Sequence, residues 1–555
     1  MVFPNTDLDV IIEAFLGADP NDDPETWPAA TDLSSRLIRK PINIRRGRGT
    51  NQKTAQAGAC TLWLDNTDGA LTPLLPTSTY YPFWDLGVPL RVSVDNVGDF
   101  PPYVRHAGFV VDVSAVMVPG VGGLNISAVQ VTSAGVLRRL GQGAAVKSAL
   151  RRTIGILDPV AYWPLEDGEN STVAASGIAG GAPMTQVLTG VEFGSGTTPD
   201  GSAAAVFVPS FGGTVDFLDP AVLAGPVSGA ADNWCVEFMA YTPYTADDGF
   251  TYVRIPAANW IGLWGGVHVG IPSLSVPRFR AFIVTASGTT FLAQTADYTD
   301  LRFWDTSHHY AAAVSQSGGN IFCELFVDGV SVASGTNAGT VAAATGAELT
   351  ARGSGDGISI SHLAIFNAST PSIDPAALDA YAGEEAHERI DRNLFEEGIN
   401  YSGGAVESNE CGPQPVADLL AVLQDAETVD HGMLIEDFAW GLNYLASTQR
   451  VNVDASLTIN LATYRTTAGT QADVLTPVRN DARISNEWTI DRPAGSSETV
   501  ADEAHIAKRG RYAKSATVNV DGDGRLRDEA QWRVHEGTFE GLRYDTVPLD
   551  IAANL

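Results

Sequence analysis

The sequence is poor in cysteine, in basic residues and in long apolar runs. Only four cysteines occur among 555 residues. They form no C-x-x-C pair and have no histidine at zinc-finger spacing, which excludes the common zinc sites. Cys60, Cys235, Cys323 and Cys411 are therefore expected to be buried, reduced thiols, since free cysteine is among the most buried residue types. A disulfide between Cys235 and Cys323 is the alternative, because both residues fall on expected strands.

The net charge and the first 20 residues indicate which partners this protein can bind and in which compartment it is made. Lys and Arg number 34 against 65 Asp and Glu, a net charge of −31. This field repels nucleic acid and anionic membranes, so we expect no direct nucleic-acid binding. No segment approaches the roughly 20 apolar residues of a membrane span, so no span is expected. Residues 1–20 lack a basic n-region and carry Asp7, Asp9 and Glu13, so they predict no secretory signal and synthesis in a cytoplasm.

Motifs for catalysis and metal binding are also missing. The chain has no G-x-S-x-G elbow, no G-x-x-x-x-G-K-[ST] loop and no H-E-x-x-H. His387-Glu388 begins like the last of these, but Asp391 stands where the second histidine is needed. Asp521 and Asp523 begin a calcium-like loop that lacks its third ligand and closing glutamate, so we predict a hairpin turn there.

Acidic residues occur as adjacent pairs such as Asp22-Asp23. A glycosidase needs two carboxylates that face each other across a sugar, whereas adjacent residues of a strand point to opposite faces. The sequence therefore predicts no catalytic residue, no metal site and no enzyme.

What the chain does contain favours a multidomain, mainly β protein. It has 56 glycines and 30 prolines, and only 18% of its residues are charged. Residues 308–335 show two strands joined by a polar turn, then a tight Asp328-Gly329 turn into a third strand. We expect Val314, Leu325 and Val327 of this meander to be core residues.

Two stretches resemble a known domain family. The pattern W-x(3)-HHYA-AVS-GG-I-ELFVDGV-VASG, from Trp304, resembles the central strands of concanavalin A-like (laminin-G-like) jelly-roll domains. The run DPVAYWPLEDG, from Asp158, resembles the entry strand of such domains, which implies that Trp163 packs in a sandwich core. A short helix with Asp374 as N-cap and Pro375 at its first position is expected to end the module.

The flanking segments resemble a second family. The order I-x-I-x-RGR, QAG-x(3)-LWLDN-x-DG-x-LTP and YYP-x(3)-LGVPLRVSV is similar to the start of minor tail proteins of siphophages that infect actinobacteria. GPQPVADLLAVLQDAE and NEWTIDRPAGSSETVADEAHIAKRGRY resemble the carboxy-terminal half of the same proteins, and the first of these two stretches predicts an amphipathic helix over 415–428. At the end of the first flank, residues 133–156 also show a helical pattern.

Together these resemblances imply a fold class that is mainly β: a discontinuous β-barrel tail-hub-like platform with an inserted concanavalin A-like jelly-roll sandwich. The expected boundaries are 1–155 for the amino-terminal part of the platform, 156–382 for the insertion and 383–555 for the carboxy-terminal part.

The implied function is that of a structural minor tail protein at the virion tail tip, forming a symmetric hub around the tail channel. A homotrimer is expected, with the distal tail protein, the tape-measure protein and other tail-tip subunits as partners. The inserted domain would contact a host cell-envelope glycan, and no cofactor is implied. The alternatives are a peripheral adsorption or lectin protein of the virion without a hub role, and a glycan-degrading tail enzyme.

Aromatic rings flanked by carboxylates and amides are the usual trace of sugar binding. They give a candidate glycan site, with packing of the two tryptophans in the core as the alternative. The site consists of Tyr252, Trp260, Trp264, His268, Asp247 and Asp248, with Asn259 nearby.

Basic clusters are rare in this acidic chain, and we interpret them as candidate contacts with an acidic neighbouring subunit. The alternatives are that these side chains are simply solvated, or that they contact the DNA that passes through a tail. The candidates are Arg45, Arg46, Arg48, Arg138, Arg139, Arg151 and Arg152.

Overall fold

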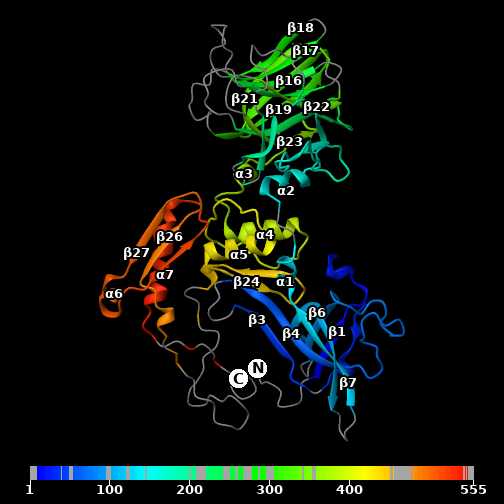
Figure 1. The fold of residues 1–555 in the computed structure, drawn as a ribbon, viewed down its shortest axis with the longest axis vertical. Helices are drawn as coiled ribbons and strands as arrows, with labels where there is room; N and C mark the ends of the chain where they lie inside the picture. The colour runs from blue at the N-terminus through cyan, green and yellow to red at the C-terminus, as the bar shows by residue number, and fades with distance from the viewer. Residues whose placement is uncertain are drawn as a thin grey trace. The chain divides into compact units, whose positions relative to one another are not determined.

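The computed structural model describes residues 9–38, 40–48, 54–95, 102–119, 125–143, 147–198, 201, 203–207, 221–241, 250–256, 260–266, 278–285, 288–295, 306–340, 343–352, 358–450, 454, 477–478, 480–541, 544 and 547. The chain divides into two compact units. Unit 1 spans Met1–Val146, Gly383–Gly412 and Ala417–Leu555, and unit 2 spans Lys147–Ala382 and Pro413–Val416. Antiparallel sheets dominate both units, so the mainly β prediction is confirmed (Figure 1).

Unit 1 is built on a seven-stranded sheet in the order β2-β1-β5-β6-β7-β4-β3. Residues of β4 alternate between buried and half-buried positions, with Cys60, Leu62 and Leu64 inside, as their spacing predicts. The sheet is open among the described strands, so the barrel closure that we expected is wrong there. Its edge strand β2 has only two residues and offers too short an edge to pair with β3. The strands are β1 (Asp9–Ala14), β2 (Thr31–Asp32), β3 (Asn43–Gly47), β4 (Gln56–Asp65), β5 (Pro89–Asp95), β6 (Tyr103–Pro119) and β7 (Asn125–Ala134).

Helices and two smaller sheets complete unit 1. The hairpin of β24 (Met433–Glu436) and β25 (Leu442–Leu445) packs near α5. The three-stranded sheet β27-β26-β28 packs against α7, and Figure 1 shows α7 lying along β26 and β27. The remaining elements are α1 (Val136–Leu140), α4 (Ala386–Glu396), α5 (Leu419–Asp430), β26 (Glu487–Asp491), β27 (Ser497–Ala501), α6 (Glu503–Arg509), β28 (Ala513–Thr517) and α7 (Leu526–Thr538).

One apolar core of unit 1 combines residues from both sides of the insertion. Val136, Leu137 and Leu140 of α1 pack in the same cluster as Leu419 and Leu423 of α5. These are the apolar stripes that the helical spacing predicts. Helix α5 begins four residues later than predicted, because the side chain of Asp418 caps it by accepting a hydrogen bond from Ala421 N at 2.9 Å.

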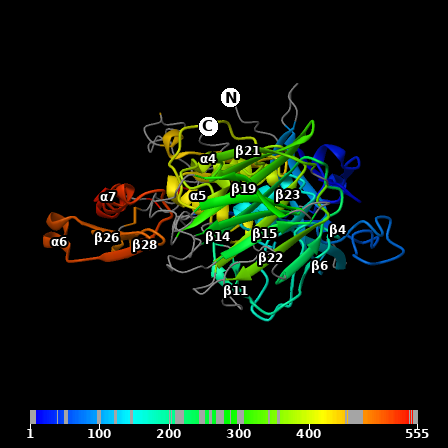
Figure 2. The ribbon, with the colours of Figure 1, turned by 90° about the horizontal axis from the view of Figure 1, so that it is seen from above.

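Unit 2 is a sandwich of two antiparallel sheets. The first has the order β18-β17-β16-β15-β22-β13-β10-β9, and the second has the order β11-β12-β23-β14-β19-β20-β21, with β8 paired to β23. Figure 2 shows β14, β19 and β23 side by side in the second sheet. The strands are β8 (Ala161–Trp163), β9 (Val173–Ala174), β10 (Met184–Gln186), β11 (Val191–Thr197), β12 (Ala203–Phe207), β13 (Leu223–Pro226), β14 (Trp234–Tyr241), β15 (Phe250–Ile255), β16 (Trp260–Gly266), β17 (Arg278–Thr285), β18 (Gly288–Gln294), β19 (Ser307–Ser317), β20 (Asn320–Val327), β21 (Val330–Ala338), β22 (Gly346–Arg352) and β23 (Ile358–Phe366).

The predicted meander and its core residues are confirmed. Strands β19, β20 and β21 follow one another with the expected turns between them. Val314, Leu325, Val327 and Trp163 are all buried in one cluster that both sheets contribute to. Asp374 caps the short helix α3 (Pro375–Leu378), with proline at its first position as predicted.

The helical pattern over 133–156 corresponds to two short helices, α1 and α2 (Ala149–Ile156), since α1 ends at Gly141, while Ser133 and Ala134 still belong to β7. One local prediction is wrong. Residues 521–524 do not turn a hairpin. They lead through a 3-10 turn, Asp523–Arg525, directly into α7.

All four cysteines are buried and free, which confirms the reduced-thiol prediction. Strand β19 lies between the strands of Cys235 and Cys323. Cys323 belongs to the sandwich core, whereas Cys235 packs with Ala311, Ala313 and Phe326 on the other face of the sheet. The alternative of a disulfide between them is therefore wrong. In the described part of the chain, no helix is both long and apolar enough to cross a membrane.

Candidate functional site

A buried ion pair marks the face of the first sandwich sheet that is turned away from the core. Val253 and Ile255 belong to the shared core, and Arg254 lies between them on β15. Because successive residues of a strand point to opposite faces, Arg254 lies on the other face. Its Nη2 is 2.7 Å from Glu348 Oε2 on the neighbouring strand β22, and only 3% of the Arg254 side chain is exposed.

The candidate glycan residues belong to this part of unit 2. Asp247, Asp248, Asn259 and His268 lie outside the described residues. The backbone of Tyr252, Trp260 and Trp264 is described on β15 and β16, while their side chains are outside the description. Position 254 pairs with position 262, so positions 260, 262 and 264 share its sheet face by register.

The candidate subunit-contact arginines divide into exposed and internally engaged groups. Arg45, Arg46 and Arg138 are exposed. Arg46 donates to Glu436 O and lies 4.1 Å from the centre of the Phe438 ring.

The other arginines lie mostly within their own unit. Arg139 donates to Pro20 O at 2.5 Å and to Asn21 Oδ1 at 2.7 Å. Arg151 forms an ion pair with Glu166. Arg152 is buried, and both Arg152 and Arg48 interact with other residues of the chain. A role in subunit contact stays a prediction for the set, with Arg45, Arg46 and Arg138 as its exposed members.

Two buried glutamates that the sequence did not reveal connect the parts of unit 1 that the insertion separates. Glu427 on α5 accepts hydrogen bonds from Ala55 N at 3.1 Å to each carboxylate oxygen. Glu436 on β24 accepts from Gly58 N at 2.8 Å and from Leu137 N at 3.0 Å. We call this pair of glutamates the flank joint. Each carboxylate satisfies backbone donors that would otherwise be buried without partners.

Burial shapes the electrostatics of the flank joint. Desolvation raises the pKa of Glu427 to about 7, although the hydrogen bonds from Ala55 and Leu434 and the charges of Arg48 and Arg450 oppose this rise. Desolvation also raises the pKa of Glu436, against the hydrogen bonds from Leu137 and Gly58 and the charge of Arg46. The joint is therefore held by acids that resist ionisation more than exposed glutamates do.

The sequence carried one signal for the flank joint, a pair of glycines. A β-carbon at Gly58 or Gly135 would overlap the Glu436 carboxylate, so both positions need to lack a side chain for the carboxylate to approach. Neither glycine has a positive φ, so the close approach of the Glu436 carboxylate, and not the backbone conformation, explains why glycine stands at both positions.

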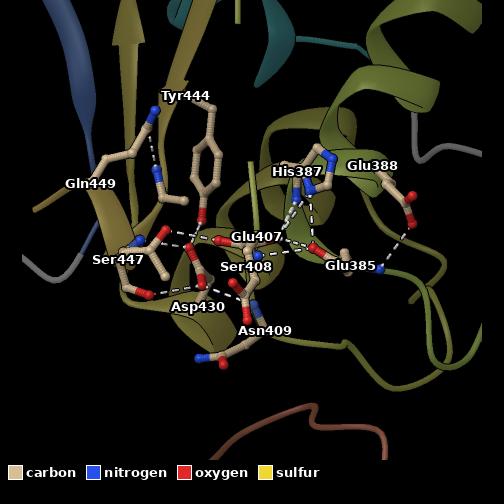
Figure 3. A network of polar contacts seen from close by, with 12 residues as sticks. Glu385, His387, Glu388, Glu407, Ser408, Asn409, Asp430, Tyr444, Ser447 and Gln449 are labelled. Carbon is tan, nitrogen blue, oxygen red and sulfur yellow. Dashed lines mark hydrogen bonds and ion pairs between the residues drawn. The ribbon is translucent and has the colours of Figure 1, made fainter. Parts of the chain in front are cut away.

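A polar network surrounds the point where the chain returns from the insertion (Figure 3). Asp430, at the end of α5, accepts from Tyr444 Oη at 2.6 Å, from Ser447 N at 3.0 Å and from Asn409 N at 2.9 Å. The backbone of Asn409 in turn accepts from Ala386 N at 2.9 Å. The network therefore fixes the first turn of α4 to the end of α5, which gives the returning chain a defined path.

Ser408, His387 and Glu385 in this network have the residue types of a hydrolase triad but not its geometry. Ser408 Oγ lies 3.1 Å from His387 Nδ1, and Glu385 Oε2 lies 3.2 Å from the same nitrogen. A triad needs the nucleophile on one ring nitrogen and the orienting acid on the other, so that the ring can accept and return a proton. This cluster is better explained as a cap, because Ser408 Oγ also accepts from His387 N at the start of α4.

No group of three or more His, Cys, Asp or Glu residues in the described regions is arranged to hold a metal ion. The calcium-like acidic stretch is engaged in protein contacts instead. Asp523 accepts from Arg492 Nε at 2.8 Å and from Ser496 N at 3.3 Å.

Comparisons with known proteins give only partial structural similarity. No family model and no curated protein sequence matches the chain. The receptor binding domain of botulinum neurotoxin type G is similar at 10% identity and a TM-score of 0.27, covering 40% of this chain and 50% of that one. This chain therefore spans about half of that domain's length.

Two further solved structures show similarly low identities and TM-scores. The CBM2 module of the evolved Dit of Lactobacillus casei BL23 phage J-1 matches at 14% identity and a TM-score of 0.22, over 32% of this chain and 90% of that one. A mutant of the GH43 protein BlXynB from Bacillus licheniformis matches at 8% identity and a TM-score of 0.26, over 61% and 67%. Similarity at this level assigns neither a family nor a function.

Proposed function

We propose that the chain is a structural protein of a phage tail tip, in which unit 1 is the assembling platform and unit 2 contacts a host-envelope glycan. The observation that carries this proposal is the flank joint. Glu427 and Glu436 bind backbone groups of the segment before the insertion, 372 and 378 residues earlier in the chain, so unit 1 needs both flanks to complete its core. A platform that is closed around an insertion can present a sandwich without depending on it for its own core.

The resemblance to minor tail proteins falls on elements of this platform. The stretch QAG-x(3)-LWLDN is strand β4, GPQPVADLLAVLQDAE contains most of α5, and NEWTIDRPAGSSETVADEAHIAKRGRY spans β26, β27 and α6. These elements supply Glu427 of the flank joint, the Gly58 N–H that Glu436 binds, and part of the core that combines both flanks. In this proposal copies of unit 1 form a trimeric hub around the channel, in contact with the distal tail protein and the tape-measure protein.

The glycan contact is proposed for the sheet face of Arg254 and Glu348. An aromatic ring covers the apolar face of a pyranose, while Glu348, whose side chain is 25% exposed, offers an acceptor for hydroxyl groups and is held in place by the buried Arg254. Register brings the tryptophan positions 260 and 264 to the strand next to that pair.

The glycan proposal is tested by binding of the purified chain to cell-wall polysaccharide of the host. We expect Trp260→Ala and Trp264→Ala each to weaken binding about tenfold, equivalent to about 1.4 kcal/mol. Trp532→Ala is the matched control, because this half-exposed tryptophan lies on α7 of unit 1. Unchanged binding in both unit 2 variants would contradict the site. Release of new reducing ends from the polysaccharide, lost in Glu348→Gln, would instead support the enzyme alternative.

A further inference from the structure

A cavity of about 220 Å³ lies in the carboxy-terminal part of unit 1, far in sequence from the residues of the proposed glycan face. Its walls come from residues 480–484, from α6 and from the chain at the end of α7. The wall is closely packed, since a β-carbon at Gly537 would overlap Ser485, and Ser485 N donates to Gly537 O at 3.4 Å. A cavity of this size suits a small group rather than a drug-sized ligand.

The lining of this cavity is balanced in charge, whereas the chain as a whole is strongly acidic. Arg483 and Arg509 line it, together with Asp481 and Glu540. At its rim Lys508 Nζ binds Glu540 at 2.7 and 2.8 Å. Lys514 Nζ lies 3.4 Å from the backbone oxygen of Ala482, which is next in sequence to the lining residues Asp481 and Arg483. The lining therefore carries two cations and two carboxylates, and two lysines lie beside it, in a protein whose net charge is −31.

His505 adds an oriented neutral donor to this wall. Asn486 is fully buried, and its Oδ1 accepts from Tyr512 N at 2.7 Å, which fixes the orientation of its amide. Asn486 Nδ2 then donates to Gly510 O at 2.7 Å and to His505 Nδ1 at 3.2 Å. Since Nδ1 accepts, the hydrogen of the neutral imidazole is on Nε2, which leaves a single N–H donor on this cavity-lining side chain.

From these observations we propose that the cavity binds a small oxyanion, either phosphate or a carboxylate group, through Arg509, Arg483 and His505. A guanidinium offers parallel N–H donors that match two oxygens of either group. Glu540 forms its shorter ion pair with Lys508, at 2.7 Å. Its distance to the Arg509 guanidinium is longer, 3.5 Å between Oε1 and Nη2. An incoming anion replaces that contact with a shorter one.

The proposal is tested by calorimetric titration of the full chain with inorganic phosphate and, separately, with sodium acetate at constant ionic strength. We expect saturable binding of at least one probe, weakened about tenfold or more in Arg509→Gln, as loss of a charged hydrogen bond implies. Arg511→Gln is the matched control, because Arg511 carries the same charge two residues away but pairs with Glu487 outside the cavity. Circular dichroism confirms that both variants are folded.

Three results would overturn the proposal. One is the absence of saturable binding of either probe up to about 50 mM. The second is an equal loss of affinity in Arg511→Gln, which indicates a general charge effect. The third is unchanged affinity in Arg509→Gln. A comparison of the two probes tells whether phosphate or a carboxylate is preferred.

Discussion

Helix α5 holds both backbone polar groups of Ala55 through its side chains. Glu427 accepts from Ala55 N across a separation of 372 residues, and Gln424 Nε2 donates to Ala55 O at 3.1 Å. Glu427 also accepts from Leu434 N at 3.3 Å, which ties the same carboxylate to the next strand. The segment before the insertion is thereby hydrogen-bonded to the segment after it. The two α5 side chains bind the N–H and the C=O of Ala55 as the backbone of a neighbouring strand would in a sheet.

This pairing predicts a pH dependence of stability. The pKa of Glu427 is raised from 4.5 to about 7, so the folded protein keeps this proton at pH values where the unfolded chain has lost it. The contribution of Glu427 to the free energy of unfolding is therefore full below about pH 4.5 and is lost as the pH rises through about 7. A shift of this size corresponds to about 3 kcal/mol. Urea unfolding at a series of pH values should show unit 1 weakening by up to that amount.

Glu427→Gln should flatten this pH dependence, leaving a smaller slope from Glu436, whose pKa is also raised. The matched control is Glu25→Gln, on an exposed 3-10 turn. If Glu427→Gln keeps the full pH dependence of the free energy of unfolding, a group other than Glu427 causes that dependence, and the prediction is contradicted.

Gly135→Ala should destabilise unit 1. The new β-carbon would overlap the Glu436 carboxylate and push it away from Gly58 N and Leu137 N. Overpacking of this kind costs about 1 to 3 kcal/mol. Gly143→Ala is the control, since a β-carbon there meets nothing within 4 Å. Equal unfolding free energies for the two variants would refute the close approach at Gly135.

Trp440→Ala should lower the stability of unit 1 and leave that of unit 2 unchanged. The indole donates to Gly108 O at 3.1 Å, and its ring lies 4.9 Å from Trp27 and 5.2 Å from Phe15. Removal of a buried tryptophan costs about 3 to 5 kcal/mol. Differential scanning calorimetry should show one transition shifted downward, with Trp532→Ala as the exposed control. A downward shift of the unit 2 transition would contradict the division of the chain.

The thiols should be unreactive in the folded protein. Burial raises the pKa of Cys60, Cys323 and Cys411 to about 12, and it raises the pKa of Cys235 well above its usual value. The thiolate is the reactive form, so a thiol reagent near pH 8 should modify none quickly and all four after denaturation. Two reactive thiols in the denatured, unreduced chain would indicate a disulfide.

Local patterns in the sequence predicted the strands of unit 2 well. The alternation around Val314 and Leu325, with Gly and Asp at the turns, is sufficient to give β19, β20 and β21. Helix α7 was missed, although Leu526, Ala530 and Val534 recur at every fourth position and are buried. The acidic turn before it resembled a hairpin turn because its composition suits either structure.

The flank joint could not be predicted, because its physical cause is not local. Whether a glutamate is buried depends on its partners, and those of Glu436 lie 378 and 299 residues away. The arginine clusters show the same limit. Their charge suggested exposed surfaces, yet Arg46 and Arg139 are held by residues distant in sequence.

A subnanometre reconstruction of the tail tip of the virion that carries this chain tests the central claim most directly. We predict copies of unit 1 arranged symmetrically around the tail channel, with density for unit 2 on the solvent side. A chain located only on a peripheral fibre, or absent from the tail tip, would contradict the proposed platform role.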